Sequence, residues 1–177
     1  MGFARDGAVE PTAVESMLIR GWRFVTLLLV ALLAGLATAQ MLERFGAATY
    51  DSGTYITVQK AAYLAWGPRD VGRLLEPVAI AATLILALLL RGRRVALWLT
   101  LGAVVALLVA YPVAYYSWME PVTRVFVAAS PTAAPANWTV LREQWAFGAE
   151  VRCVSELIAL CALLASAVID AHPRGKD

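Results

Sequence analysis

Four long apolar stretches are the feature that most constrains this chain. They cover residues 22–41, 74–90, 95–118 and 146–169, and each approaches the roughly 20 residues that a helix needs to cross a bilayer. Of the 177 residues, 60% are hydrophobic and only 16% are charged, a balance that is typical of membrane proteins. The sequence therefore predicts an all-α fold, a four-helix transmembrane bundle, organised as a single integral membrane domain over residues 1–177.

The first stretch has a second interpretation. Arg20 and Arg23 lie at its start, and Ala37-Thr38-Ala39 resembles a signal-peptidase site. Cleavage there would leave three spans. We favour a transmembrane helix because the family resemblance described below requires one at this position.

The distribution of positive charge predicts the orientation. Lysines and arginines gather before the first span, in the very short link between the second and third spans, and after the fourth; they are Arg5, Arg20, Arg23, Arg91, Arg93, Arg94, Arg174 and Lys176. Such residues concentrate on the cytoplasmic side. We expect a multi-pass protein of the cell membrane with both termini in the cytoplasm. A net charge of +2 without a long basic run makes the bilayer the expected partner and excludes a nucleic-acid partner.

The first outer loop contains a predicted short helix at residues 54–66. Tyr55, Gln59, Tyr63 and Trp66 lie near one face of it, and Gly67-Pro68 is a stop signal. Such a helix would lie flat at the membrane interface or cap the bundle.

A polar stripe marks the last helix, which we expect to start near Trp138. Its members follow one another at intervals of three and four residues, so they share one helix face; they are Arg142, Trp145, Ala149, Arg152 and Glu156. A charge at membrane depth is costly unless it is paired or wetted. The stripe should therefore face the bundle interior.

Other helices offer polar partners near the outer mouth. Glu76 begins the second span, Glu120 follows Trp118 at the end of the third, and Gln40 ends the first; no matching cluster is expected in the inner half. Three interpretations remain open: a structural ion pair that fixes helix register, a ligand pocket, or a proton or ion path. The single histidine, His172, lies in a charged tail, so neither a metal nor a cofactor is expected.

Trp138, Leu141, Arg142 and Trp145, followed by Gly148 and Arg152, form a spaced motif. This motif resembles the signature of the anthrone-oxygenase-like family, small four-helix membrane proteins mostly catalogued as a domain of unknown function. The resemblance implies a cofactor-free oxygenase that oxidises a lipophilic aromatic substrate in an outer polar pocket. Two positions depart from the family pattern, since Ala149 stands where the family has a histidine and Thr123 where it has an asparagine.

Two functions follow from these observations. In an oxygenase-like enzyme, the candidate catalytic residues are Arg152, Glu156 and Glu76. The candidate ligand-binding residues for a lipophilic aromatic molecule are Arg142, Trp145, Glu120, Trp118, Tyr55 and Gln59. The alternative is a non-enzymatic accessory subunit or small lipophilic-ligand-binding protein, in which the stripe is a structural ion-pair network.

Overall fold

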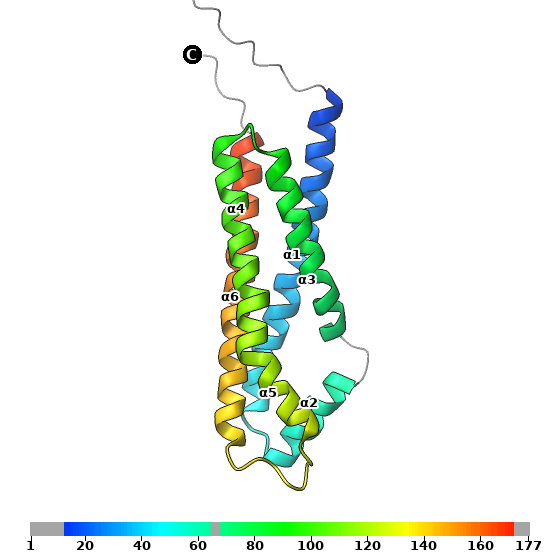
Figure 1. Ribbon diagram of the computed structural model, residues 1–177, viewed down its shortest axis with the longest axis vertical. Helices are drawn as coiled ribbons and strands as arrows, with labels where there is room; N and C mark the ends of the chain where they lie inside the picture. Colours follow the sequence, from blue (N-terminus) through cyan, green and yellow to red (C-terminus); the bar gives the residue numbers. More distant parts are fainter. Residues whose placement is uncertain (1–12, 65–67, 172–177) are drawn as a thin grey trace, which may run out of the picture.

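A computed structural model describes residues 13–64 and 68–171, which form a tall bundle of helices (Figure 1). An isolated β-bridge joins Ser130 and Ala133, and the described residues contain no β-strand. The helical elements are α1 (Ala13–Ala47), α2 (Ser52–Leu64), α3 (Pro68–Leu89), α4 (Arg94–Leu108), the π-helix η1 (Val109–Met119), α5 (Glu120–Ala128) and α6 (Trp138–Ala171). The predicted all-α bundle is confirmed.

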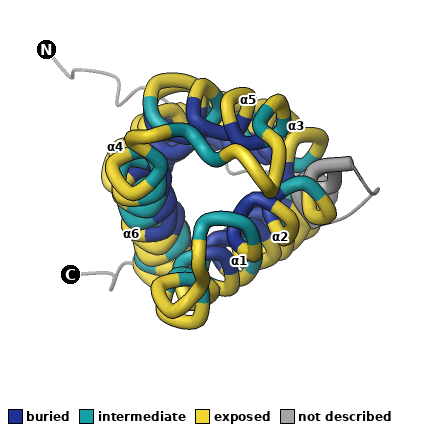
Figure 2. Tube along the Cα trace, turned by 90° about the horizontal axis from the view of Figure 1, so that it is seen from below, coloured by how far each residue is buried: buried dark blue, intermediate teal, exposed yellow. Residues whose placement is uncertain are grey.

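Four segments of this bundle are long and apolar enough to cross a membrane: Met17–Ala47, Gly72–Leu89, Arg94–Ala128 and Trp138–Asp170. Their outward faces carry large exposed apolar side chains, such as Leu32, Leu88, Trp98 and Ile158, while buried residues face the bundle axis (Figure 2). A continuous apolar exterior marks a surface that contacts something other than water. The chain is therefore an integral membrane protein with a lipid environment.

The bundle has two different ends (Figure 1). The start of α1, the end of α6 and the short α3–α4 link lie at one end, called here the terminal end. The helices α2 and α5 and the 129–137 connection lie at the other, called the α2 end. Between them α6 packs against α4, η1 and α1, and α3 packs against α1 and α4.

The third segment stays helical farther than we expected from the sequence. Glu120 and Pro121 were expected to end it, yet the helix continues through α5 to Ala128. Pro121 occupies the first turn of α5, directly after the wider turns of η1, and the helix continues there although Pro121 has no backbone N–H to donate. Pro112 cannot donate a backbone hydrogen bond, and the chain around it widens into η1, where the Glu120 amide donates to the Tyr115 carbonyl five residues back.

The predicted helix in the first loop is confirmed as α2, although Trp66 and Gly67 and the side chain of Tyr63 lie outside the described residues. Asp51 caps its start, accepting hydrogen bonds from the Thr54 amide at 2.9 Å and the Thr54 hydroxyl at 3.0 Å. These bonds lower the pKa of Asp51. At Gly53 a Cβ would lie 2.9 Å from the Pro131 carbonyl oxygen, so glycine allows α2 to approach the 129–137 connection.

Tight packing between η1 and α6 depends on Gly148. A Cβ at this position would lie 2.7 Å from Met119 Cγ and 3.0 Å from Trp118 Cβ. Both distances are shorter than normal carbon contacts. Glycine at this position lets the widened π-helix lie directly against α6.

We predict that Gly148→Ala lowers the free energy of unfolding by about 1–3 kcal/mol, because the added methyl forces η1 and α6 apart. Thermal unfolding in detergent measures the effect. The control is Gly35→Ala on α1, where a Cβ meets nothing within 4 Å and stability should be unchanged or slightly raised. Equal transition temperatures for the two variants would contradict this account of the η1–α6 contact.

Candidate functional site

Arg152 stands at the centre of a buried polar cluster that joins three helices. Its Nε donates to Glu156 Oε1 at 2.9 Å on the next turn of α6, and its Nη1 donates to Gln40 Oε1 of α1 at 3.0 Å. Its Nη2 forms an ion pair with Glu76 Oε1 of α3. All four side chains are buried. We call these residues the Arg152 network, and they show that the sequence stripe does face the interior.

The Arg152 network places one positive group against two carboxyl groups. The second oxygens, Glu76 Oε2 and Glu156 Oε2, are buried and have no hydrogen-bond partner among the described residues. A small cavity of about 10 Å³, close to the size of one water, adjoins the network. It is lined by Gln40, Arg73, Glu76, Tyr111, Tyr115, Met119 and Arg152.

The π-helix supplies the fourth wall of this small cavity. Tyr111, Tyr115 and Met119 follow one another at intervals of four residues on η1, and all three line it. A π-helix has more residues per turn than an α-helix, so this spacing keeps the three side chains on one face. The Tyr111 hydroxyl lies 3.1 Å from the Tyr116 hydroxyl, which is on the exposed side of η1.

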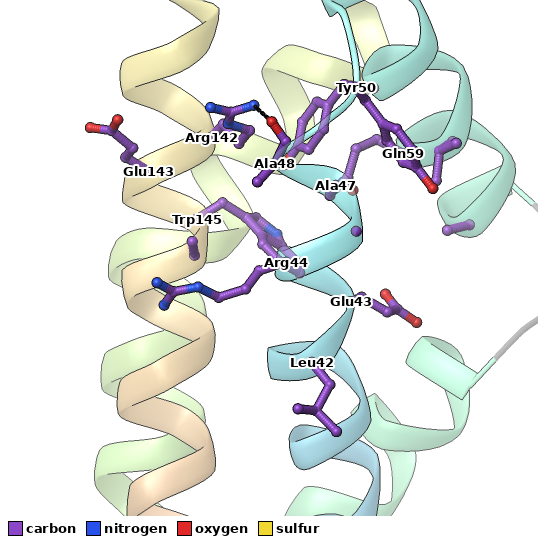
Figure 3. Close-up of a pocket in the computed structure, with 15 residues that line it drawn as sticks. Leu42, Glu43, Arg44, Ala47, Ala48, Tyr50, Gln59, Arg142, Glu143 and Trp145 are labelled. Carbon is purple, nitrogen blue, oxygen red and sulfur yellow. Dashed lines mark hydrogen bonds between the residues drawn. The ribbon is translucent and has the colours of Figure 1, made fainter.

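A much larger cavity of about 540 Å³ lies at the α2 end, between the last turns of α1, the helix α2 and the first turns of α6 (Figure 3). We call it the α2-end cavity. Four residues from the sequence prediction line it, namely Tyr55, Gln59, Arg142 and Trp145. Arg142 donates to the Ala48 carbonyl at 3.4 Å, and its guanidinium carbon lies 5.0 Å from the centre of the Trp138 ring. Members of the Arg152 network do not line this cavity.

Two further candidates lie apart from both cavities. Glu120 forms an ion pair with Arg124 one turn along α5, at 2.6 Å, and does not approach Arg152. Trp118 packs edge-on against Phe147 with ring centres 5.2 Å apart. Neither side chain lines a described cavity, so their ligand-binding roles stay predictions.

A second polar cluster, at the terminal end, was not expected from the sequence. Asp170 of α6 forms ion pairs with Arg23 of α1, at 3.0 Å, and with Arg93 in the α3–α4 link. This Asp170 network corrects the expectation of a polar cluster only near the outer mouth. The sequence does contain a signal for it. Asp170 follows the fourth apolar stretch, Arg23 lies at the start of the first, and Arg93 lies in the link between the second and third.

The separation of the two networks along α6 can be compared with the thickness of a membrane. Asp170 follows Arg152 by 18 positions on α6, which is about 27 Å at the helical rise of about 1.5 Å per residue. A hydrocarbon core is about 30 Å thick. The two networks are therefore separated along α6 by nearly the thickness of such a core.

The fold and site define a multi-pass, all-α membrane protein with a hollow α2 end. Comparisons with models of protein families, with curated proteins and with solved structures found no match. The anthrone-oxygenase-like resemblance accordingly stays a prediction.

We predict that Arg152→Leu lowers the free energy of unfolding by about 3–5 kcal/mol, because two buried carboxyl groups lose their cationic partner. Denaturation in detergent measures the loss. Arg124→Leu, which removes the largely exposed partner of Glu120, is the control and should cost less than about 1 kcal/mol. An Arg152→Leu protein as stable as its parent would show that the Arg152 network does not hold the helices together.

Proposed function

We propose that this membrane protein binds a planar, lipophilic phenol- or quinol-type molecule in the α2-end cavity. The observation that carries the proposal is the cavity itself. Its volume of about 540 Å³ falls within the range of small-molecule sites, which combine apolar and aromatic walls with a few polar groups.

The lining of the cavity fits an aromatic molecule with one polar edge. Tyr50, Tyr55 and Trp145 give it flat apolar surfaces, and such rings stack on or pack edge-to-face against aromatic ligands. The amide of Gln59 and the guanidinium of Arg142 also line it, from opposite walls (Figure 3). Hydrogen-bond donors and acceptors on two walls suit a phenolic or quinol oxygen.

The location favours a ligand that dissolves in the bilayer. The exposed apolar side chains of Leu42 and Val58 belong both to the cavity lining and to the outer surface. We place the Asp170 network at one boundary of the hydrocarbon core, which puts the α2-end cavity at the opposite interface. A lipophilic molecule with one polar group concentrates at that depth, so it reaches the cavity from the lipid.

Oxidation of the bound molecule, which the family resemblance implies, has weaker support than binding. A general base must reach the proton that it removes, yet Glu76, Glu156 and Arg152 do not line the α2-end cavity. Ala149 is buried on the α6 face between Trp145 and Arg152, where a family histidine would connect the two regions. The binding function, with the Arg152 network as a structural element, is therefore the alternative that we adopt.

We predict that Ala62→Trp weakens binding of anthrone, a planar lipophilic probe, by at least about tenfold, because the indole fills the cavity that Ala62 lines. The matched control is Ala61→Trp. Ala61 is also exposed on α2 but does not line the cavity, so affinity should match the parent. Equilibrium binding of anthrone to purified protein in lipid nanodiscs measures the affinities of the parent, Ala61→Trp and Ala62→Trp.

Two outcomes would contradict the binding proposal. One is absence of saturable binding by the parent, and the other is equal weakening by Ala61→Trp and Ala62→Trp. Oxygen consumption recorded in the same samples separates the two functions, because saturable binding without consumption supports a binding protein and anthrone-dependent consumption supports an oxygenase.

The orientation is the second part of the proposal. We propose that the terminal end faces the cytoplasm, because it carries the dense arginines of the α3–α4 link and of the start of α1. The α2-end cavity then opens at the outer leaflet of the cell membrane.

For this orientation we predict that cysteines introduced at Ser52 and Ala133 react in whole cells with a membrane-impermeant thiol reagent, while one at Gly92 does not. The native Cys153 is buried and Cys161 lies on the lipid-facing surface, so both are first replaced by alanine. Reaction at Gly92 alone would reverse the orientation.

A further inference from the structure

The charge balance of the Arg152 network is the starting point for a second site, independent of the proposed ligand. Glu76 and Glu156 share one guanidinium, and both are at least 96% buried. With both carboxyl groups ionised, the network carries a net charge of −1 close to the hydrocarbon region. An uncompensated buried charge of this kind is neutralised most simply by binding a proton.

Hydrogen bonding points the same way. The guanidinium directs its three nitrogens to Glu156 Oε1, Gln40 Oε1 and Glu76 Oε1, so the geometry leaves Oε2 of each glutamate without a partner among the described residues. Ionised carboxylates are acceptors only, whereas a protonated one gains an O–H donor. Glu76 lines the small cavity, where one water can accept that hydrogen bond.

The groups around the glutamates do not offer a second positive charge inside the network. On α3, Arg73 lines the small cavity but is itself exposed. From η1, the Tyr111 and Tyr115 side chains face it, and α1 contributes the neutral amide of Gln40. Of the charged residues that follow on α1 and precede on α6, Arg44 and Glu150 pair with each other, and Glu43 lines the α2-end cavity.

We propose that Glu76 and Glu156 form a buried proton-binding site that holds one shared proton at neutral pH and exchanges it with the aqueous phase at the α2 end only. Each glutamate becomes ionised and paired with Arg152 when the other is removed. The site gives the protein a titratable group within the membrane, separate from the ligand cavity.

One-sided access follows from what surrounds the network. Towards the α2 end, the small cavity is lined by exposed Arg73 and by Tyr111, whose hydroxyl is bonded to that of exposed Tyr116. Towards the terminal end, the packed helices contribute a buried apolar core: Val30, Leu33, Ala79, Leu86, Ala159 and Leu163. The buried hydroxyls on that side, Thr26, Thr83, Thr100 and Ser166, bond to backbone carbonyls of the helices or to one another. A proton therefore meets a water-sized cavity on the first route, and on the second a packed core in which the few hydroxyls already bond to the helix backbone or to one another.

Infrared spectroscopy of the reconstituted full chain tests the shared proton. At pH 7 the parent should show the carbonyl stretch of one protonated carboxylic acid, shifted in D₂O. The band should be absent in both Glu76→Gln and Glu156→Gln, because the remaining carboxylate then pairs one-to-one with Arg152. The control Glu120→Gln, which alters an ion pair on α5, should keep the band.

Three results would overturn the site: no protonated band in the parent at pH 7, persistence of the band in both variants, or loss in one variant only, which would assign the proton to a single glutamate. If a variant does not accumulate, the pH dependence of the band in the parent tests the site instead. The band should then persist well above the pH range in which exposed carboxyl groups ionise, and its loss within that range would overturn the site. Proton entry into vesicles containing the parent should equal that of protein-free vesicles. Faster entry would overturn the one-sided access.

Discussion

A guanidinium inside a lipid-surrounded bundle must find its hydrogen-bond acceptors on neighbouring helices, and this requirement organises the α2 half of the protein. Arg152 reaches Gln40 on α1, Glu76 on α3 and Glu156 on its own helix. Sliding or rotating any of the three helices would leave a buried charge unpaired. The Arg152 network therefore contributes to the register of these helices, together with close packing such as that of Gly148 against η1.

The position of the network also separates the two cavities. The α2-end cavity lies between α1, α2 and α6, beyond the last helical turns that the Arg152 network holds together. There α2 packs on α5 through Tyr55 and Phe126, whose ring centres lie 5.1 Å apart. The cavity therefore forms where the cap rests on the rim of the bundle, and the charged residues below it remain packed.

Hydropathy and spacing predict much of this arrangement. Four apolar stretches define the spans, and the three-and-four spacing of Arg142, Trp145, Arg152 and Glu156 defines an inward face, because charge burial is costly and helix geometry is regular. Glu76 was found as a partner by the same reasoning, since it opens a short apolar span.

Other features depend on information that such patterns do not contain. Glu120 was expected to face Arg152, but the helix continues past Pro121 and brings Arg124 within reach one turn later. The α2-end cavity depends on how the first loop folds back over the bundle. Asp170 pairs with arginines from two distant segments. Contacts between different helices do not follow a regular spacing in the sequence, so spacing could not predict these pairs.

The Asp170 network has a mechanical consequence. One carboxylate ties the start of α1, the α3–α4 link and the end of α6 together. The helices are therefore held together by ion pairs at the terminal end. At the opposite end, α1 joins α2 through the four-residue 48–51 connection and closes over empty volume. We therefore expect local opening to cost less at the α2 end, where the cap covers a cavity, than at the terminal end, where Asp170 ties three segments together.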